Sequence, residues 1–275
     1  MTMKQYPSLE IVPPLKGMTK DELLDDIRPF IEFAPKYINV TCHRDEIMYD
    51  EQPDGSYRKR LVRRRVSETA VCGAIQSEFK VDVVPHLICG GLTAEQIEFQ
   101  LQDFKFMGLS NVLALRGDCL TGEKRFSPVH GGYNHANELV EAIRRFEKDN
   151  GCEGFFRIGV GGYPEKHFEA ANMDEDIANL KRKVDAGADY ITTQMFFDNK
   201  VFYSFVDRCR KAGITVPIIP GLKPISTPKQ VKLLPESFSI DIPFELTSEI
   251  AAHEEDKGAV YQIGQEWTTA QCKDL

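Results

Sequence analysis

The chain has 275 residues, of which 42% are hydrophobic, so it can bury the core of a large α/β domain. Its 34 basic and 42 acidic residues give a net charge of −8, which argues against a nucleic-acid binder that relies on neutralising phosphates. No apolar run approaches the ~20 residues of a membrane span, and the first ten residues lack the apolar centre of a signal peptide. We therefore expect a cytoplasmic protein. The seven cysteines are dispersed, which predicts reduced thiols and no metal site.

Strand-like apolar runs alternate with helix signals along the chain. The predicted strands are 8–12, 37–41, 81–89, 111–115, 155–160, 190–194 and 216–220. Helices are predicted after each of them, and capping residues begin several, namely Thr19, Thr93, Asn172 and Thr227. The remainder of the chain after the last of these also has helical spacing. A polar stretch with an Asp54-Gly55 turn leads into the basic run Arg58–Arg65, which we interpret as a solvated loop and helix start.

Seven such βα units predict an α/β fold, a parallel sheet closed as a (β/α)8 TIM barrel within one domain, residues 1–275. One strand of the eight is missing. The final helix, with Val260 and Trp267 at helical spacing, has no later strand to follow it. We therefore expect a C-terminally truncated barrel.

Polar side chains stand at the ends of six of the predicted strands. In a TIM barrel the active site lies at these carboxyl ends. Each residue alone has an ordinary structural explanation, such as an ion pair or a hydrogen bond to the backbone. Together they favour an active site at this end of the barrel. The residues are Glu10, Thr41, His86, Arg116 with Asp118, Tyr163 and Gln194.

The segment Gly159-Val-Gly161-Gly-Tyr-Pro164 fails the last position of the G-x-G-x-x-G pattern, so a Rossmann site is not expected. Its glycines indicate either a tight turn or a close approach of the backbone to a flat or phosphate-bearing ligand. On the helix that follows, Asp176, Arg182 and Lys183 form either a solvated face or a charged rim for ribose and pyrophosphate.

Several motifs extend over residues 8 to about 235. They are Leu9-Glu10-x-x-Pro13-Pro14, Val40-Thr41, Pro85-His86-Leu87, Ala114-Leu-Arg-Gly-Asp118, Tyr163-Pro-Glu-x-His167, Asn179-Leu-Lys-Arg-Lys-Val-Asp-Ala-Gly-Ala188, Thr193-Gln194-x-Phe-Phe-Asp198 and Ile219-Pro-Gly221. In these motifs the chain resembles the methylenetetrahydrofolate reductase family, in its short form without a regulatory domain. The resemblance implies a TIM barrel that binds FAD, takes hydride from NADH or NADPH, and reduces 5,10-methylenetetrahydrofolate for methionine synthesis. It also implies a homo-oligomer and no feedback by S-adenosylmethionine.

The resemblance assigns roles to individual residues. Glu10 would be the general acid, kept protonated because burial in the barrel mouth raises its pKa. Asp118 would lie by the flavin and the pterin, and Gln194 would bind the pterin edge. The positions that would contact FAD are Thr41, His86, Arg116, Gly117, Asp118, Tyr163, His167, Asp176, Arg182 and Lys183, the last two at the phosphates.

Some features depart from the family pattern and leave alternatives open. The last strand has no counterpart, and Leu234 stands where some members have an aromatic residue. The basic run could face water or attract an anionic substrate such as a polyglutamate tail, with Arg58 and Arg63 as the cations. A Schiff-base lyase that uses Lys223 and a non-catalytic truncated barrel are the alternative functions.

Overall fold

The computed structural model describes residues 7–119 and 125–275. The chain forms two compact units, residues 1–159 and 160–275, and the boundary falls inside the strand β7 (Arg157–Gly162). The single domain expected from the sequence stays a prediction. In the part of the chain that the structure describes, no helix is long and apolar enough to cross a membrane.

A seven-stranded sheet has the hydrogen-bonded order β1-β2-β5-β6-β7-β8-β9. The pairings of β1 with β2, β2 with β5, β5 with β6, and β8 with β9 are parallel. Parallel strands in chain order with helices between them are the topology of a TIM barrel, so the predicted α/β barrel fold lacking one strand is confirmed. Besides β7, the strands are β1 (Leu9–Ile11), β2 (Tyr37–Val40), β5 (Asp82–Ile88), β6 (Asn111–Leu115), β8 (Tyr190–Met195) and β9 (Ile218–Gly221).

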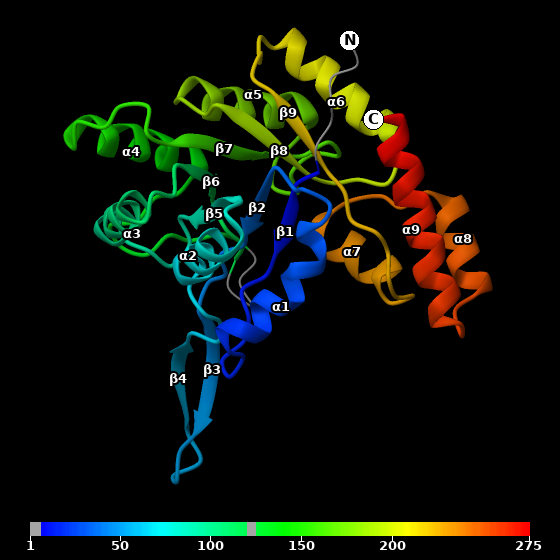
Figure 1. Cartoon of the computed structure of the whole chain (residues 1–275), viewed down its shortest axis with the longest axis horizontal. Coiled ribbons are helices and arrows are strands. Elements are labelled where there is room, and N and C mark those ends of the chain that lie inside the picture. Colours follow the sequence, from blue (N-terminus) through cyan, green and yellow to red (C-terminus); the bar gives the residue numbers. More distant parts are fainter. Residues whose placement is uncertain (1–6, 120–124) are drawn as a thin grey trace. The chain divides into compact units, whose positions relative to one another are not determined.

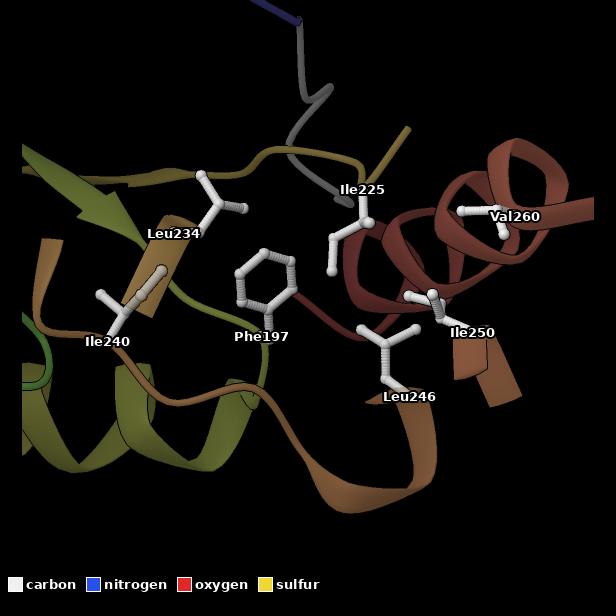
Figure 2. Packing of buried hydrophobic residues seen from close by; sticks show 7 residues of the cluster. All are labelled: Phe197, Ile225, Leu234, Ile240, Leu246, Ile250 and Val260. Carbon is white, nitrogen blue, oxygen red and sulfur yellow. The ribbon is translucent and has the colours of Figure 1, made fainter. Parts of the chain in front are cut away.

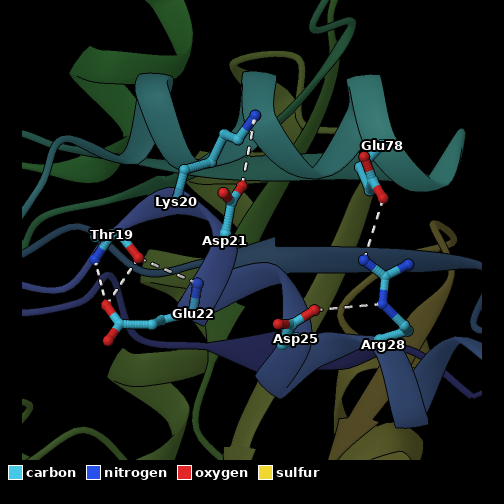
Figure 3. A network of polar contacts seen from close by, with 7 residues as sticks. All are labelled: Thr19, Lys20, Asp21, Glu22, Asp25, Arg28 and Glu78. Atoms are coloured by element: carbon cyan, nitrogen blue, oxygen red, sulfur yellow. Dashed lines mark hydrogen bonds and ion pairs between the residues drawn. The ribbon is translucent and has the colours of Figure 1, made fainter.

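Two helices of the first unit begin at the capping boxes that the sequence predicted. Thr19 and Glu22 form the predicted capping box, and so do Thr93 and Gln96. Figure 3 shows the first box and an exposed pairing in which Arg28 lies 3.2 Å from Glu78 of the next helix. Such exposed pairs add little stability, so burial of the apolar faces holds these helices in place. The helices are α1 (Lys20–Ile31), α2 (Glu68–Phe79), α3 (Ala94–Phe106) and α4 (Ala136–Asp149).

The polar stretch after β2 is a β-hairpin, not the solvated loop that the sequence predicted. Its strands β3 (Glu46–Glu51) and β4 (Tyr57–Val62) form a separate two-stranded ribbon (Figure 1). Gly55 has φ +80°, which suits the turn at the predicted position. Arginines of the basic run pair with acids of the same segment: Arg60 with Asp50, Arg63 with Asp45 and Arg64 with Glu46. This internal neutralisation favours a solvated surface over attraction of an anionic substrate.

Five helices are described in the second unit. Asn172 caps the first as predicted, accepting from the N–H of Glu175 at 2.9 Å. Thr227 does not cap the α7 helix, whose N-cap is Lys229; instead the Gln230 side chain accepts from the N–H of Thr227. The helices are α5 (Met173–Asp185), α6 (Asn199–Lys211), α7 (Gln230–Phe238), α8 (Phe244–Ala252) and α9 (Lys257–Asp274).

The last three helices pack around an apolar cluster, shown in Figure 2. The indole N–H of Trp267 on α9 donates to the carbonyl of Phe197 at 2.9 Å, and the amide of Gln271 donates to the carbonyl of Phe196 at 3.1 Å. The predicted final helix is therefore anchored to the segment that follows β8. The cluster consists of Phe197, Ile225, Leu234, Ile240, Leu246, Ile250 and Val260.

Gly264 lets the α9 backbone approach Ile225, since a Cβ there would lie 1.9 Å from the Ile225 carbonyl oxygen. Alanine usually stabilises a helix relative to glycine. We expect the reverse for G264A, a loss of roughly 3 kcal/mol or more in the free energy of unfolding from urea denaturation, because a backbone atom blocks the methyl group. In the control G258A the new Cβ meets only the Asp256 side chain, at 3.3 Å, and we expect a change within about 1 kcal/mol. Equal stability of the two variants would contradict this packing.

Candidate active site

The strand register of the first unit brings three predicted site residues to one face of the sheet. Glu10 on β1 is opposite Asn39 on β2, and Asn39 is opposite Val84 on β5. Side chains alternate between the two faces along a strand. Thr41 and His86, two residues further along their segments, therefore share the face of Glu10.

His86 is a buried, neutral imidazole. Its side chain is 6% exposed, and its Nε2 lies 3.8 Å from the Glu10 carboxylate. Burial, followed by the nearby His43, lowers the pKa of His86 to about 3. The contact with Glu10 is therefore not an ion pair at neutral pH. Among the described residues no group forms a hydrogen bond with this Nε2, so a buried polar atom is left to a ligand or solvent.

The expected burial of Glu10 is wrong. Its side chain is 58% exposed, so desolvation does not supply the proposed protonation. The physical reason is the place of β1 at the end of the strand order, where only β2 pairs with it among the described strands. An edge strand leaves one side of its residues open to solvent.

Thr41 continues the site beyond the end of β2. Its N–H donates to the carbonyl of Ile11 at 3.0 Å, and its hydroxyl is 3.0 Å from Nε2 of His43. Burial, followed by the positive charge of Arg65, lowers the pKa of His43, against the opposing effect of the Asp118 carboxylate. His43 thus lies within electrostatic reach of both His86 and Asp118. His43 was not among the site residues predicted from the sequence.

The segment after β6 turns sharply at Gly117. The hydrogen bonds that pair β5 with β6 continue past the ends of both strands. The last of them runs from the N–H of Gly90 to the carbonyl of Arg116, at 3.0 Å. Gly117 then has φ +84°, and a Cβ there would lie 3.2 Å from Cβ of Ile88. The guanidinium of Arg116 stacks 4.9 Å from the centre of the Phe126 ring. This turn exposes Asp118, and only glycine adopts it without strain.

Four predicted residues of the second unit form one cluster. The rings of Tyr163 and His167 meet edge to face, with centroids 4.7 Å apart. Lys183 reaches over Tyr163 at 5.8 Å and donates to the carbonyl of Gly161 at 2.5 Å. Asp176 accepts from the N–H of His167 at 3.0 Å, and burial raises the pKa of this carboxyl. The helix α5 thus places the carboxyl group of Asp176 and the amino group of Lys183 beside the turn after β7.

The other predicted residues of this unit are less engaged. Arg182 is exposed on α5 and donates to Asn179. Gln194 turns back on its own chain, where its oxygen accepts from the N–H of Met195 at 2.9 Å. Lys223 is exposed just beyond β9, whereas a Schiff-base lysine is commonly activated by desolvation in an apolar pocket.

A carboxyl group that the sequence reading did not assign also lies in the second unit. Glu165 follows Tyr163 and Pro164 and accepts from the N–H of Asp241. Burial, opposed by that N–H and supported by the carboxylates of Asp241 and Asp198, raises the pKa of Glu165 to about 7. Its place in the Tyr-Pro-Glu-x-His motif was the available signal. Glu165 is therefore a candidate acid near neutral pH.

Each unit, taken by itself, contains residues whose chemistry suits part of a large anionic and aromatic cofactor such as FAD. In the first unit the buried Nε2 of His86 has no hydrogen-bond partner among the described residues, and the left-handed turn at Gly117 precedes the exposed Asp118. In the second unit Tyr163 offers a ring, and Lys183 and Arg182 offer cations that suit phosphates. Among the described residues no group of three His, Cys, Asp or Glu side chains could hold a metal ion.

These observations define a class: a TIM-barrel-type α/β protein with polar side chains at the carboxyl ends of its strands, where enzymes of this fold have their active sites. Within that class the chain belongs to the methylenetetrahydrofolate reductase family, whose model matches residues 2–275.

Curated relatives agree with this family. The chain is 37% identical over 277 residues to methylenetetrahydrofolate reductase (NADH) 1 of Arabidopsis thaliana, covering 98% of this chain and 43% of that protein. It is 38% identical over 214 residues to the Zea mays protein of the same name, covering 74% and 35%. It is 31% identical over 236 residues to the 5,10-methylenetetrahydrofolate reductase of Escherichia coli K12, covering 86% and 70%. The chain thus spans less than half of the plant relatives.

A solved structure supports the fold. It is described as an uncharacterized protein from Clostridium thermocellum that binds two copies of 5-methyl-5,6,7,8-tetrahydrofolic acid. The similarity has a TM-score of 0.52 at 14% sequence identity and covers 98% of this chain and 84% of the other.

His86 provides a test of the first unit. Since its pKa is lowered from 6.5 to about 3, we expect its imidazole to stay neutral between about pH 5 and pH 8. Nitrogen NMR chemical shifts over this range measure the protonation state, and H86Q identifies the signal by removing it. Protonation of His86 near pH 6 would show that it is not buried as described.

Proposed function

We propose that this protein reduces 5,10-methylenetetrahydrofolate to 5-methyltetrahydrofolate, with NADH or NADPH as the hydride donor and FAD as the bound cofactor. The family match carries the proposal, because it extends over residues 2–275 and so includes all the candidate site residues. A cytoplasmic location, a homo-oligomeric state and a role in methionine synthesis belong to the same proposal and come from the family resemblance.

FAD, when bound, would supply the hydride-transfer chemistry that links the nicotinamide nucleotide to the folate. In the first unit the buried Nε2 of His86, which has no hydrogen-bond partner among the described residues, offers it a polar atom, and the turn at Gly117 places Arg116 and Asp118. In the second unit, Arg182 and Lys183 offer positive charge for its phosphates. The residues that would hold it are Thr41, His86, Arg116, Gly117, Asp118, Tyr163, His167, Asp176, Arg182 and Lys183.

Reduction of the methylene bridge to a methyl group breaks the bond between that carbon and N10 of the folate. N10 must therefore gain a proton, and Glu10 is the proposed donor. The exposed position of Glu10 lets solvent return the proton after each turnover. His86, 3.8 Å away, is neutral and so does not form an ion pair with Glu10 at neutral pH.

Two further residues are proposed to act on the substrate. The Asp118 carboxylate would stabilise positive charge that develops on the folate as the bond to N10 breaks. Gln194 would bind the pterin edge through its amide, and this requires its oxygen to exchange the N–H of Met195 for a ligand.

Transient kinetics separates the two half-reactions. We expect the E10Q variant to accept hydride from NADH or NADPH at the wild-type rate but to reduce methylenetetrahydrofolate about 10²- to 10⁴-fold more slowly, because the proton donor is missing. Stopped-flow absorbance of the flavin measures both steps, and E98Q, on the exposed surface of α3, serves as the matched control. A wild-type rate of folate reduction in E10Q would contradict the role of Glu10.

A further inference from the structure

We propose that Arg44 is a positioning residue for Asp118: it ties the segment after β2 to the turn after β6 and so fixes where the Asp118 carboxylate stands. This inference rests on the proposed function, because Asp118 acts there on the folate. Arg44 lies between the end of β2 and the hairpin strand β3, outside the motifs that carry the family resemblance.

The first observation is a hydrogen bond that begins where the strand ladder stops. The ladder bonds beyond β6 run from the N–H of Cys89 to the carbonyl of Leu115 and from the N–H of Gly90 to the carbonyl of Arg116. The chain then turns at Gly117 and leaves the ladder. Nη1 of Arg44 donates to the carbonyl of Asp118 at 3.1 Å, so a side chain holds the backbone just after the turn.

The second observation is that Gly90 makes room for Arg44. A Cβ on Gly90 would lie 2.7 Å from Cδ of Arg44 and 3.1 Å from its Nε. The side chain of Arg44 therefore runs directly along the backbone of the segment after β5. Any larger residue at position 90 would push it away from Asp118.

The third observation is a shared aromatic ring. The guanidinium of Arg44 lies 5.6 Å from the centre of the Phe126 ring, and that of Arg116 lies 4.9 Å from it. The negative face of the ring attracts both cations and reduces their mutual repulsion. Arg44 thus contacts both the carbonyl of Asp118 and the ring of Phe126.

This arrangement is less stable than one in which every buried donor of the arginine forms a hydrogen bond. Nε of Arg44 is buried and forms no hydrogen bond with the residues described. A buried donor without a partner destabilises the folded state, because it has lost its hydrogen bonds to water. A site where accurate placement of a carboxylate matters is where such a cost is expected to persist.

Two variants remove the hydrogen bond from Arg44 to the carbonyl of Asp118 in different ways. R44Q shortens the side chain and removes the guanidinium, whereas G90A keeps Arg44 but displaces its stem. In both we expect faster hydrogen–deuterium exchange in residues 115–119 of the ligand-free protein and a fall of about 10- to 100-fold in the kcat of folate reduction, since small misplacements of a reacting group have effects of this size. R145Q, an exposed arginine on α4, should change neither quantity.

A double-mutant cycle shows whether Arg44 acts through Asp118. Once D118A has removed the carboxylate, R44Q has nothing left to position, so its further effect on the single-turnover rate should be less than about twofold. Wild-type exchange at residues 115–119 in both variants, or a full additional loss from R44Q in the D118A background, would overturn the inference. The exchange measurement needs no substrate, so a wild-type protein that fails to reduce the folate would refute the proposed function while exchange still decides the role of Arg44.

Discussion

The parallel register of β1, β2 and β5 is the constraint on which the candidate site depends. Because Glu10, Asn39 and Val84 are level with one another, the polar residues that end each apolar run face the same side of the sheet. A shift by one residue in any strand would turn its polar residue to the other face. The buried cores of β2 and β5 fix this register, since Ile38, Val40 and Leu87 are fully buried.

The same register brings together two groups that differ in burial. His86 is buried and neutral, and Glu10, 3.8 Å away, is open to solvent on an edge strand. A proton donor needs access to water so that it can be reprotonated. A residue that orients a ligand forms stronger hydrogen bonds when water is excluded. Their different burial therefore matches the separate roles proposed for them.

The sequence predicted the seven strands and the barrel-type fold because apolar runs and capping residues are local signals. Thr19, Thr93 and Asn172 cap their helices as expected. The exposure of Glu10 could not be read from the sequence, because it depends on which strand forms the sheet edge. The hairpin was missed because β4 is largely charged, and its residues are held by cross-strand pairs such as Arg60 with Asp50 rather than by a buried face. His43 and Arg44 were missed because their contacts with Thr41 and Asp118 arise only in the fold.

The most direct test of the central claim, that polar residues at the strand ends bind a flavin, is the FAD content of the purified protein. The chain is reconstituted with excess FAD, freed of unbound cofactor and denatured, and the released FAD is measured by absorbance against protein concentration. We predict a full equivalent of FAD per chain. Folded protein that retains none would contradict the claim.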